Sequence, residues 1–76
     1  LAMAYEAIRR GGNAACVVNA ANEVVNLAFR QDKCGFLQMA EVIAKTLERV
    51  PYIKEPSLED YLETDRIARI TATELL

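Results

Sequence analysis

The stretch NAANEVVNLAFRQ at residues 19–31 decides the fold class, because its apolar residues recur at intervals of three and four. Residues spaced in this way share one side of an α-helix. We predict that Asn19 caps the start of this helix, since its side-chain oxygen can accept hydrogen bonds from the first free backbone N–H groups. The apolar face consists of Ala21, Val24, Val25, Ala28 and Phe29.

A second helix is predicted downstream, from about Leu37 to Val50, with apolar residues at the same spacing. Residues 32–35 (Asp-Lys-Cys-Gly) form the turn between the two helices. Pro51 ends the second helix, because the residue before a proline is pushed out of the helical region. Residues 51–56 then form a short extended linker.

The last 20 residues contain two helix-start signals. Ser57 is followed three residues later by Asp60, which resembles a capping box with Asp in place of the usual Glu. Thr64-Asp65 is the second signal, and we expect Asp65 to open a final helix. One bent helix over residues 58–76 is the alternative.

The first ten residues also have helical spacing, with Leu1, Ala4, Tyr5 and Ile8 on one face. Gly11-Gly12 ends this helix, because glycine accepts the left-handed conformation that closes helices. Residues 13–18 are predicted to be an apolar connector without a helical stripe. The sequence therefore predicts an all-α protein, a compact bundle of four to five short helices forming one domain over residues 1–76.

Composition excludes several classes of partner. The net charge is −2, and the nine basic residues are scattered, so nucleic-acid binding is not expected. No segment reaches the 18 apolar residues of a membrane span. A cytoplasmic location is expected, and we expect the two cysteines, Cys16 and Cys34, to be unpaired rather than bridged. The chain does not begin with Met, and we therefore interpret it as a piece of a longer protein.

No catalytic constellation is visible. The chain has no His, so a Ser/His or Cys/His pair cannot form within it. Neither a GxGxxG motif nor a P-loop is present. The five acids from Glu55 to Asp65 lie near predicted helix starts, where the helix dipole favours negative charge. We therefore predict no catalytic, cofactor-binding or metal-binding residue in this chain.

Asn22 is unusual for the middle of a helix, because its amide competes with backbone bonding. We expect it to bond the backbone of the connector before the helix; a polar contact to another domain is the alternative.

The same block carries a resemblance to a known family. LAMAYEA at residues 1–7, Gly11-Gly12, VNAANEV at residues 18–24 and DRIAR at residues 65–69 resemble the C-terminal domain of 1-deoxy-D-xylulose 5-phosphate reductoisomerases. The resemblance extends over nearly the whole chain. The Asn-Ala-Ala-Asn-Glu block, with Asn19, Asn22 and Glu23, is its most specific part. Residues 58–60 and 65–69 are similar to the family's closing helices, in which an Asp at the position of Asp65 starts the last helix.

The resemblance implies a parent enzyme of the non-mevalonate isoprenoid pathway, which uses NADPH and a divalent cation, Mg or Mn. It implies that this chain is a non-catalytic structural domain whose partners are the remaining domains of the enzyme. The parent is expected in the bacterial cytoplasm, or in plastids for a plant-type enzyme. A free-standing helical interaction module is the alternative. We expect some self-association of the isolated domain through its first helix or residues 13–18.

Overall fold

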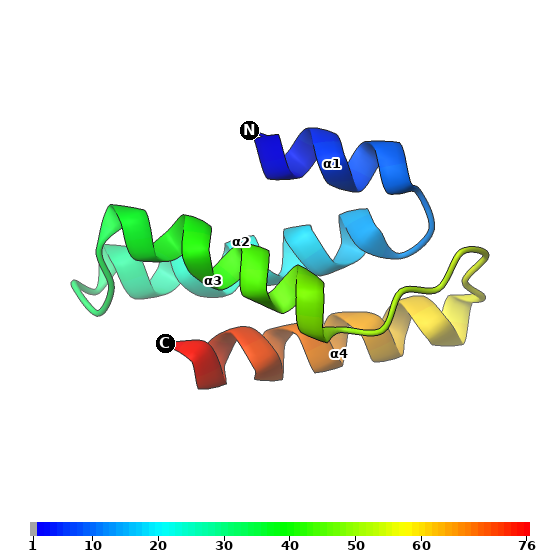
Figure 1. The fold of residues 1–76 in the computed structure, drawn as a ribbon. Helices are drawn as coiled ribbons and strands as arrows, with labels where there is room; N and C mark the ends of the chain where they lie inside the picture. The colour runs from blue at the N-terminus through cyan, green and yellow to red at the C-terminus, as the bar shows by residue number, and fades with distance from the viewer. Residues whose placement is uncertain (1) are drawn as a thin grey trace.

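Four helices make up the part of the chain that the computed structural model describes, residues 2–76 with side chains from Tyr5 onward. They are α1 (Ala2–Arg10), α2 (Ala14–Arg30), α3 (Phe36–Arg49) and α4 (Leu58–Leu75). Figure 1 shows them as a compact bundle in which consecutive helices run in opposite directions. The predicted all-α bundle is confirmed.

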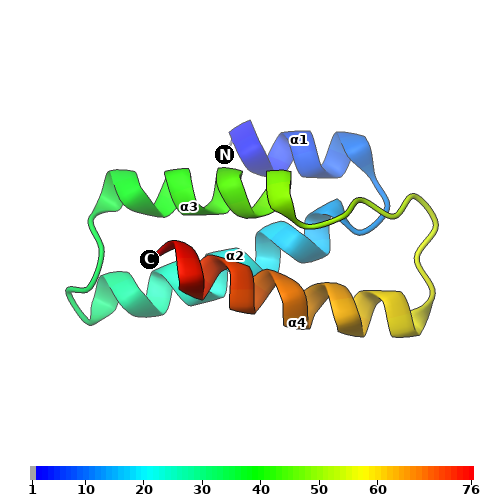
Figure 2. The ribbon, with the colours of Figure 1, turned by 60° about the horizontal axis from the view of Figure 1, so that its bottom comes forward.

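The central element is α2, which packs against each of the other three helices. α3 and α4 also pack against each other, whereas α1 packs mainly on α2. In Figures 1 and 2, α1 lies over the first half of α2, and α4 lies on the opposite side of it. α1 and α4 therefore expose different faces of the bundle.

Small side chains line the contact between α2 and α4. Ala20, Ala21, Ala68 and Ala72 have no exposed surface. Alanines let two helix axes approach closely, so the core is thin and dense and contains few large side chains. Valines and Ile43 from α2 and α3 fill the remaining space.

The start of α2 differs from the sequence prediction. The helix begins at Ala14, five residues before Asn19, and residues 14–18 are helical instead of forming a connector. Ala14 and Val17 are buried in line with Ala21 and Val25, so the apolar stripe extends about two turns further back. The exposed or half-buried Ala15, Cys16 and Val18 hide this stripe in the sequence.

α4 is one continuous helix, as in the alternative interpretation of residues 58–76. Thr64 and Asp65 lie inside it and do not cap a second helix. Thr64 is buried, and its hydroxyl oxygen accepts a hydrogen bond from the amide of Asn13, the residue before α2. This contact accounts for a threonine in mid-helix.

The turn at residues 32–35 lies where the sequence predicts it. Asp32 adopts a positive φ of 57°. The Lys33 N–H donates to the Ala28 carbonyl and the Asp32 N–H donates to the Phe29 carbonyl. These two bonds form a Schellman closure with Asp where Gly is usual.

The face of α1 that packs on the bundle differs from the apolar face that the sequence predicts. Ala7 is buried, but Tyr5 and Ile8, which we placed on the apolar face, are 68% and 72% exposed. Leu1 and the side chain of Ala4 lie outside the described residues.

Candidate functional site

Asn13 is the polar centre of the fold. Its side chain is 1% exposed, and its amide nitrogen donates to the Pro51 carbonyl and to the Thr64 hydroxyl oxygen, each at 3.0 Å. Its amide oxygen accepts from the Ile53 N–H at 2.9 Å. Both amide donors are therefore used, and one side chain joins the start of α2 to the linker and to α4.

Gly12 lets the linker lie close to the turn that contains Asn13. Its φ is +56°, and a Cβ at this position would lie 2.2 Å from the Ile53 carbonyl oxygen. The Asn13 N–H donates to that same carbonyl at 3.0 Å. Only glycine lets the linker approach the turn this closely.

The sequence interpretation missed Asn13, which it placed in an apolar connector. A sequence signal was present, since an Asn directly after two glycines is typical of a turn. Its partners lie 38 to 51 residues away, so no local pattern could identify them.

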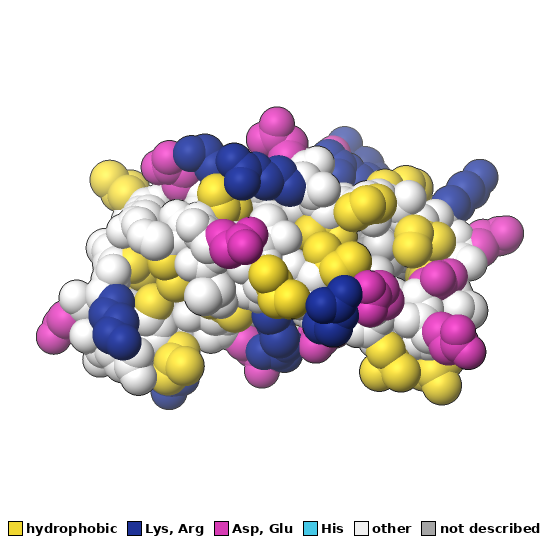
Figure 3. Space-filling model, turned by 90° about the horizontal axis from the view of Figure 1, so that it is seen from below, with side chains coloured by type: hydrophobic (Ala, Val, Ile, Leu, Met, Phe, Trp, Pro, Cys, Tyr) yellow, Lys and Arg dark blue, Asp and Glu magenta, His cyan; other side chains and the backbone are white. Residues whose placement is uncertain are grey.

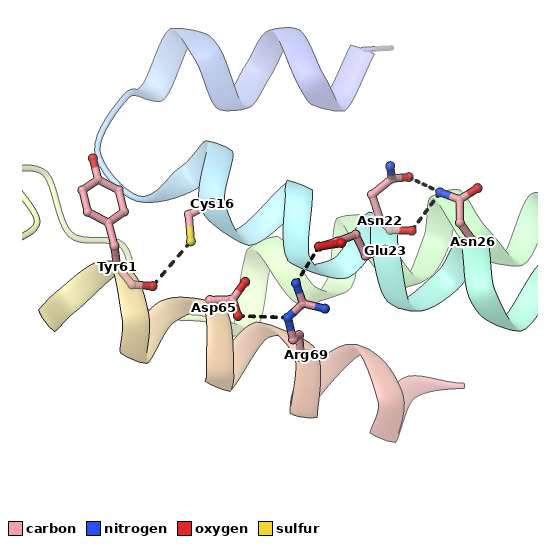
Figure 4. Close-up of polar contacts among 7 residues, drawn as sticks. All are labelled: Cys16, Asn22, Glu23, Asn26, Tyr61, Asp65 and Arg69. Atoms are coloured by element: carbon pink, nitrogen blue, oxygen red, sulfur yellow. Dashed lines mark hydrogen bonds and ion pairs between the residues drawn. The ribbon is translucent and has the colours of Figure 1, made fainter. Parts of the chain in front are cut away.

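A charged cluster connects α2 to α4, as Figure 4 shows. Arg69 of α4 donates from Nε to Asp65 at 2.9 Å and from its terminal nitrogen to Glu23 of α2 at 2.5 Å. Both hydrogen bonds raise the pKa of Arg69 above its ordinary value, and the bond with Asp65 has the larger effect. The sequence interpretation singled out Glu23 and Asp65. Arg69, which it did not single out, joins the two.

Cys16 lies beside this cluster, and its thiol contacts the Tyr61 carbonyl at 3.6 Å (Figure 4). Partial burial raises the pKa of the thiol, and the nearby carboxylate of Asp65 raises it further. Cys16 and Cys34 are both free, as expected.

Asn19 and Asn22 do not have the roles that the sequence interpretation assigned. Asn19 lies in the middle of α2 and is exposed, so it cannot cap a helix that begins at Ala14. Asn22 does not bond the connector. Its side-chain and backbone oxygens accept from the Asn26 amide at 2.9 and 2.8 Å (Figure 4).

We call Asn19, Asn22 and Asn26 the amide row. Their spacing of three and four puts them on one side of α2. Each Asn in a helix interior is less favourable than Ala by roughly 0.5 kcal/mol. The amide row therefore weakens α2 locally. The hydrogen bonds between Asn26 and Asn22 account for two of its residues and leave Asn19 unexplained.

A pocket of about 250 Å³ opens between α1 and α2 at one end of the amide row. Its walls are mostly apolar and its rim includes two amides; the lining residues are Ala7, Ile8, Ala15, Val18, Asn19 and Asn22.

The capping box at the start of α4 is confirmed. The Asp60 N–H donates to Ser57 Oγ at 3.1 Å, and the Ser57 N–H donates to the Asp60 carboxylate at 2.9 Å. Ser57 thus has the structural role predicted for it.

The acids of α4 do not converge. Glu63 accepts two hydrogen bonds from Arg66. These bonds are the main reason why the pKa of Glu63 is lowered. In residues 2–76, no three Asp, Glu or Cys side chains lie close enough together to hold a metal ion. None of the helices described is long and apolar enough to cross a membrane.

Figure 3 shows the face of the molecule on the α4 side, where acidic and basic side chains alternate with separate apolar patches. No single sign of charge dominates this face. Such a mixture is usual for a solvated surface and does not select an anionic or cationic ligand.

Two comparisons with known proteins agree on the family. The model of the DXP reductoisomerase C-terminal domain matches residues 1–71. Curated relatives over the full 76 residues are the 1-deoxy-D-xylulose 5-phosphate reductoisomerases of Phocaeicola vulgatus, at 58% identity, and Bacteroides thetaiotaomicron, at 54%. The enzyme of the same name from Solibacter usitatus is 43% identical over 75 residues.

This chain spans about a fifth of the length of these relatives: 20% of the first two and 19% of the third. The match covers all of α1, α2 and α3 and most of α4. The chain belongs to the family of DXP reductoisomerase C-terminal domains.

Proposed function

We propose that this chain is the C-terminal helical domain of a complete 1-deoxy-D-xylulose 5-phosphate reductoisomerase, and that it supports this enzyme structurally. The observation that carries the proposal is the 58% identity to such an enzyme over all 76 residues. The whole enzyme would convert 1-deoxy-D-xylulose 5-phosphate to 2-C-methyl-D-erythritol 4-phosphate in the non-mevalonate isoprenoid pathway. Its remaining domains are the proposed partners, and its proposed location is the bacterial cytoplasm.

The donor groups of this chain do not fit the NADPH and the divalent cation that the family implies. Glu23 and Asp65, two acids on different helices, both bond Arg69, whose positive charge would oppose a bound cation. In the double glycine, Gly12 packs against the Ile53 carbonyl of the linker, so the close approach that this glycine permits is taken by the chain itself and is not open to a phosphate. We therefore assign both ligands to the rest of the enzyme.

The supporting role rests on the way Asn13 and Gly12 fasten three segments together. Reacting groups must be held in place closely, and small displacements reduce rates strongly. A bundle fixed in this way offers the catalytic part of the enzyme a rigid body to pack against. None of the residues that hold the bundle together needs to touch the substrate.

Domain replacement tests the proposal. Residues 1–76 would replace the corresponding fifth of the Phocaeicola vulgatus enzyme, and NADPH oxidation would be followed with 1-deoxy-D-xylulose 5-phosphate and Mg²⁺. We expect kcat and KM within about threefold of the parent values, because this domain supplies no reacting group. The matched control is the parent enzyme with its C-terminal fifth deleted.

We expect the deleted enzyme to lose its thermal stability and its activity together. A well-folded hybrid without NADPH oxidation would contradict the proposal, and so would a deleted enzyme that keeps full activity and stability.

A further inference from the structure

The face of the bundle formed by α1 and the amide row has features that the isolated fold does not use. Asn19 and Asn22 lie exposed in mid-helix, where other residues would favour the helix more. Among the described residues, the side chain of Asn19 makes no hydrogen bond, and Asn22 bonds only Asn26. Residues that break a local rule without a local gain point to a function outside the fold.

Apolar surface adjoins these amides. Ile8 is 72% exposed at the edge of the pocket between α1 and α2, and Tyr5 is 68% exposed one turn earlier. Three of the lining residues, Ala7, Ala15 and Val18, have small side chains, which leaves room for an inserted side chain. An apolar centre with a polar rim is the usual composition of a protein interface.

The position of the domain in the family indicates what covers this face. In the relatives the matching region is the C-terminal domain and one fifth of the chain, so the other four-fifths joins it ahead of α1. The start of α1 lies above α2, on the side to which Asn22 points in Figure 4. The preceding polypeptide therefore reaches the domain beside the pocket and the amide row.

We propose that the α1 and amide-row face is the surface on which the rest of the reductoisomerase docks. An apolar side chain of that part inserts between Ile8 and Val18, and its neighbouring backbone groups bond the amides of Asn19 and Asn22. An amide side chain offers both a donor and an acceptor, which suits a peptide backbone. The inference rests on the proposed function, since it takes the reductoisomerase as the partner.

Thiol footprinting of the full-length hybrid enzyme tests the proposal. Asn22→Cys and Asn19→Cys place a thiol on the face. Leu62→Cys is the matched control: Leu62 is a 66% exposed residue of α4, the helix that lies on the side of α2 opposite to α1 (Figure 1). Each variant is labelled with a maleimide, and the modified peptide is quantified by mass spectrometry. All three positions are exposed in this domain, so folding should be preserved.

We expect labelling at positions 19 and 22 to be at least about tenfold slower than at position 62, because a docked domain excludes the reagent. Equal fast labelling at all three positions would overturn the proposal, and so would slow labelling at position 62. The readout does not depend on turnover. An inactive hybrid contradicts the proposed function, whereas an active hybrid with fast labelling at positions 19 and 22 contradicts only the docking face.

Discussion

At the scale of single residues, Asn13 is a buried side chain that joins the start of α2 to the linker and to α4. Asn13→Ala would leave the Ile53 N–H, the Pro51 carbonyl and the Thr64 hydroxyl without their partner. We expect the free energy of unfolding to fall by roughly 2–4 kcal/mol, because unpaired buried polar groups keep their desolvation cost. Urea unfolding followed by circular dichroism measures this change.

Asn19→Ala is the matched control, with the same chemical change at an exposed position of the same helix. We expect the stability to stay level or to rise by roughly 0.5 kcal/mol, since Ala is the better helix former. A loss comparable to that of Asn13→Ala would show that Asn19 is a fold-determining residue after all.

The contrast between Ser57 and Asn13 shows what could be predicted for individual residues. The capping box of Ser57 is complete within four residues of sequence, so its pattern identifies it. Asn13 bonds residues up to 51 positions away, and its role exists only once the helices are packed. The same limit hid Arg69, which joins Glu23 to Asp65 across 46 residues.

At the scale of elements, the turn between α1 and α2 provides a sharp test of the close approach to the linker. Gly12→Ala would bring a Cβ to 2.2 Å from the Ile53 carbonyl, whereas a Cβ at Gly11 meets nothing within 4 Å. Both glycines have a positive φ. We expect Gly11→Ala to cost about 1–2 kcal/mol for the backbone alone, and Gly12→Ala to cost clearly more.

Thermal melts of the two variants measure this difference. Equal losses at the two positions would mean that the backbone conformation matters and the contact with Ile53 does not.

The packing of α2 on α4 predicts the reactivity of Cys16. Burial, and then Asp65, raises the pKa of this thiol, so less thiolate is present at neutral pH than in an ordinary exposed cysteine. Its alkylation rate should therefore rise at higher pH than that of a small model thiol. Asp65→Asn should move the profile to lower pH, because one of the causes that raise the pKa is removed.

Iodoacetamide labelling of Cys16 across a pH series measures the profile. A profile that Asp65→Asn leaves unchanged would contradict the assigned influence of Asp65.

The sequence predicts α3 well and the start of α2 poorly, for a physical reason. The apolar residues of α3 lie three and four apart, and Pro51 marks its end, so both signals are local. In α2 the first turns also carry Ala15, Cys16 and Val18, apolar residues that are exposed or half-buried. They hide the buried stripe in the sequence, and the start of the helix follows from the Gly11-Gly12 turn instead.

At the scale of the whole molecule, the polar residues of the family block, Asn19, Asn22 and Glu23, lie outside the packed core. The sequence identifies the family through this block, yet Asn19 and Asn22 are exposed and Glu23 joins a surface ion pair. The packing depends on Asn13, Gly12 and a row of alanines, two of which, Ala20 and Ala21, lie in the same block. The block therefore has two sides: its alanines belong to the core, and its polar side chains face outward, which agrees with a polar side that faces a partner.

The most direct test of the supporting role is the turnover number of Glu23→Gln in the full-length hybrid enzyme, measured beside its thermal midpoint. Glu41→Gln, an exposed acid of α3 paired with Lys45, is the matched control. If this domain supplies no catalytic or metal-binding group, kcat should stay within about threefold for both variants. A fall of about a hundredfold in kcat for Glu23→Gln alone, with an unchanged midpoint, would place Glu23 in the active site and contradict the account.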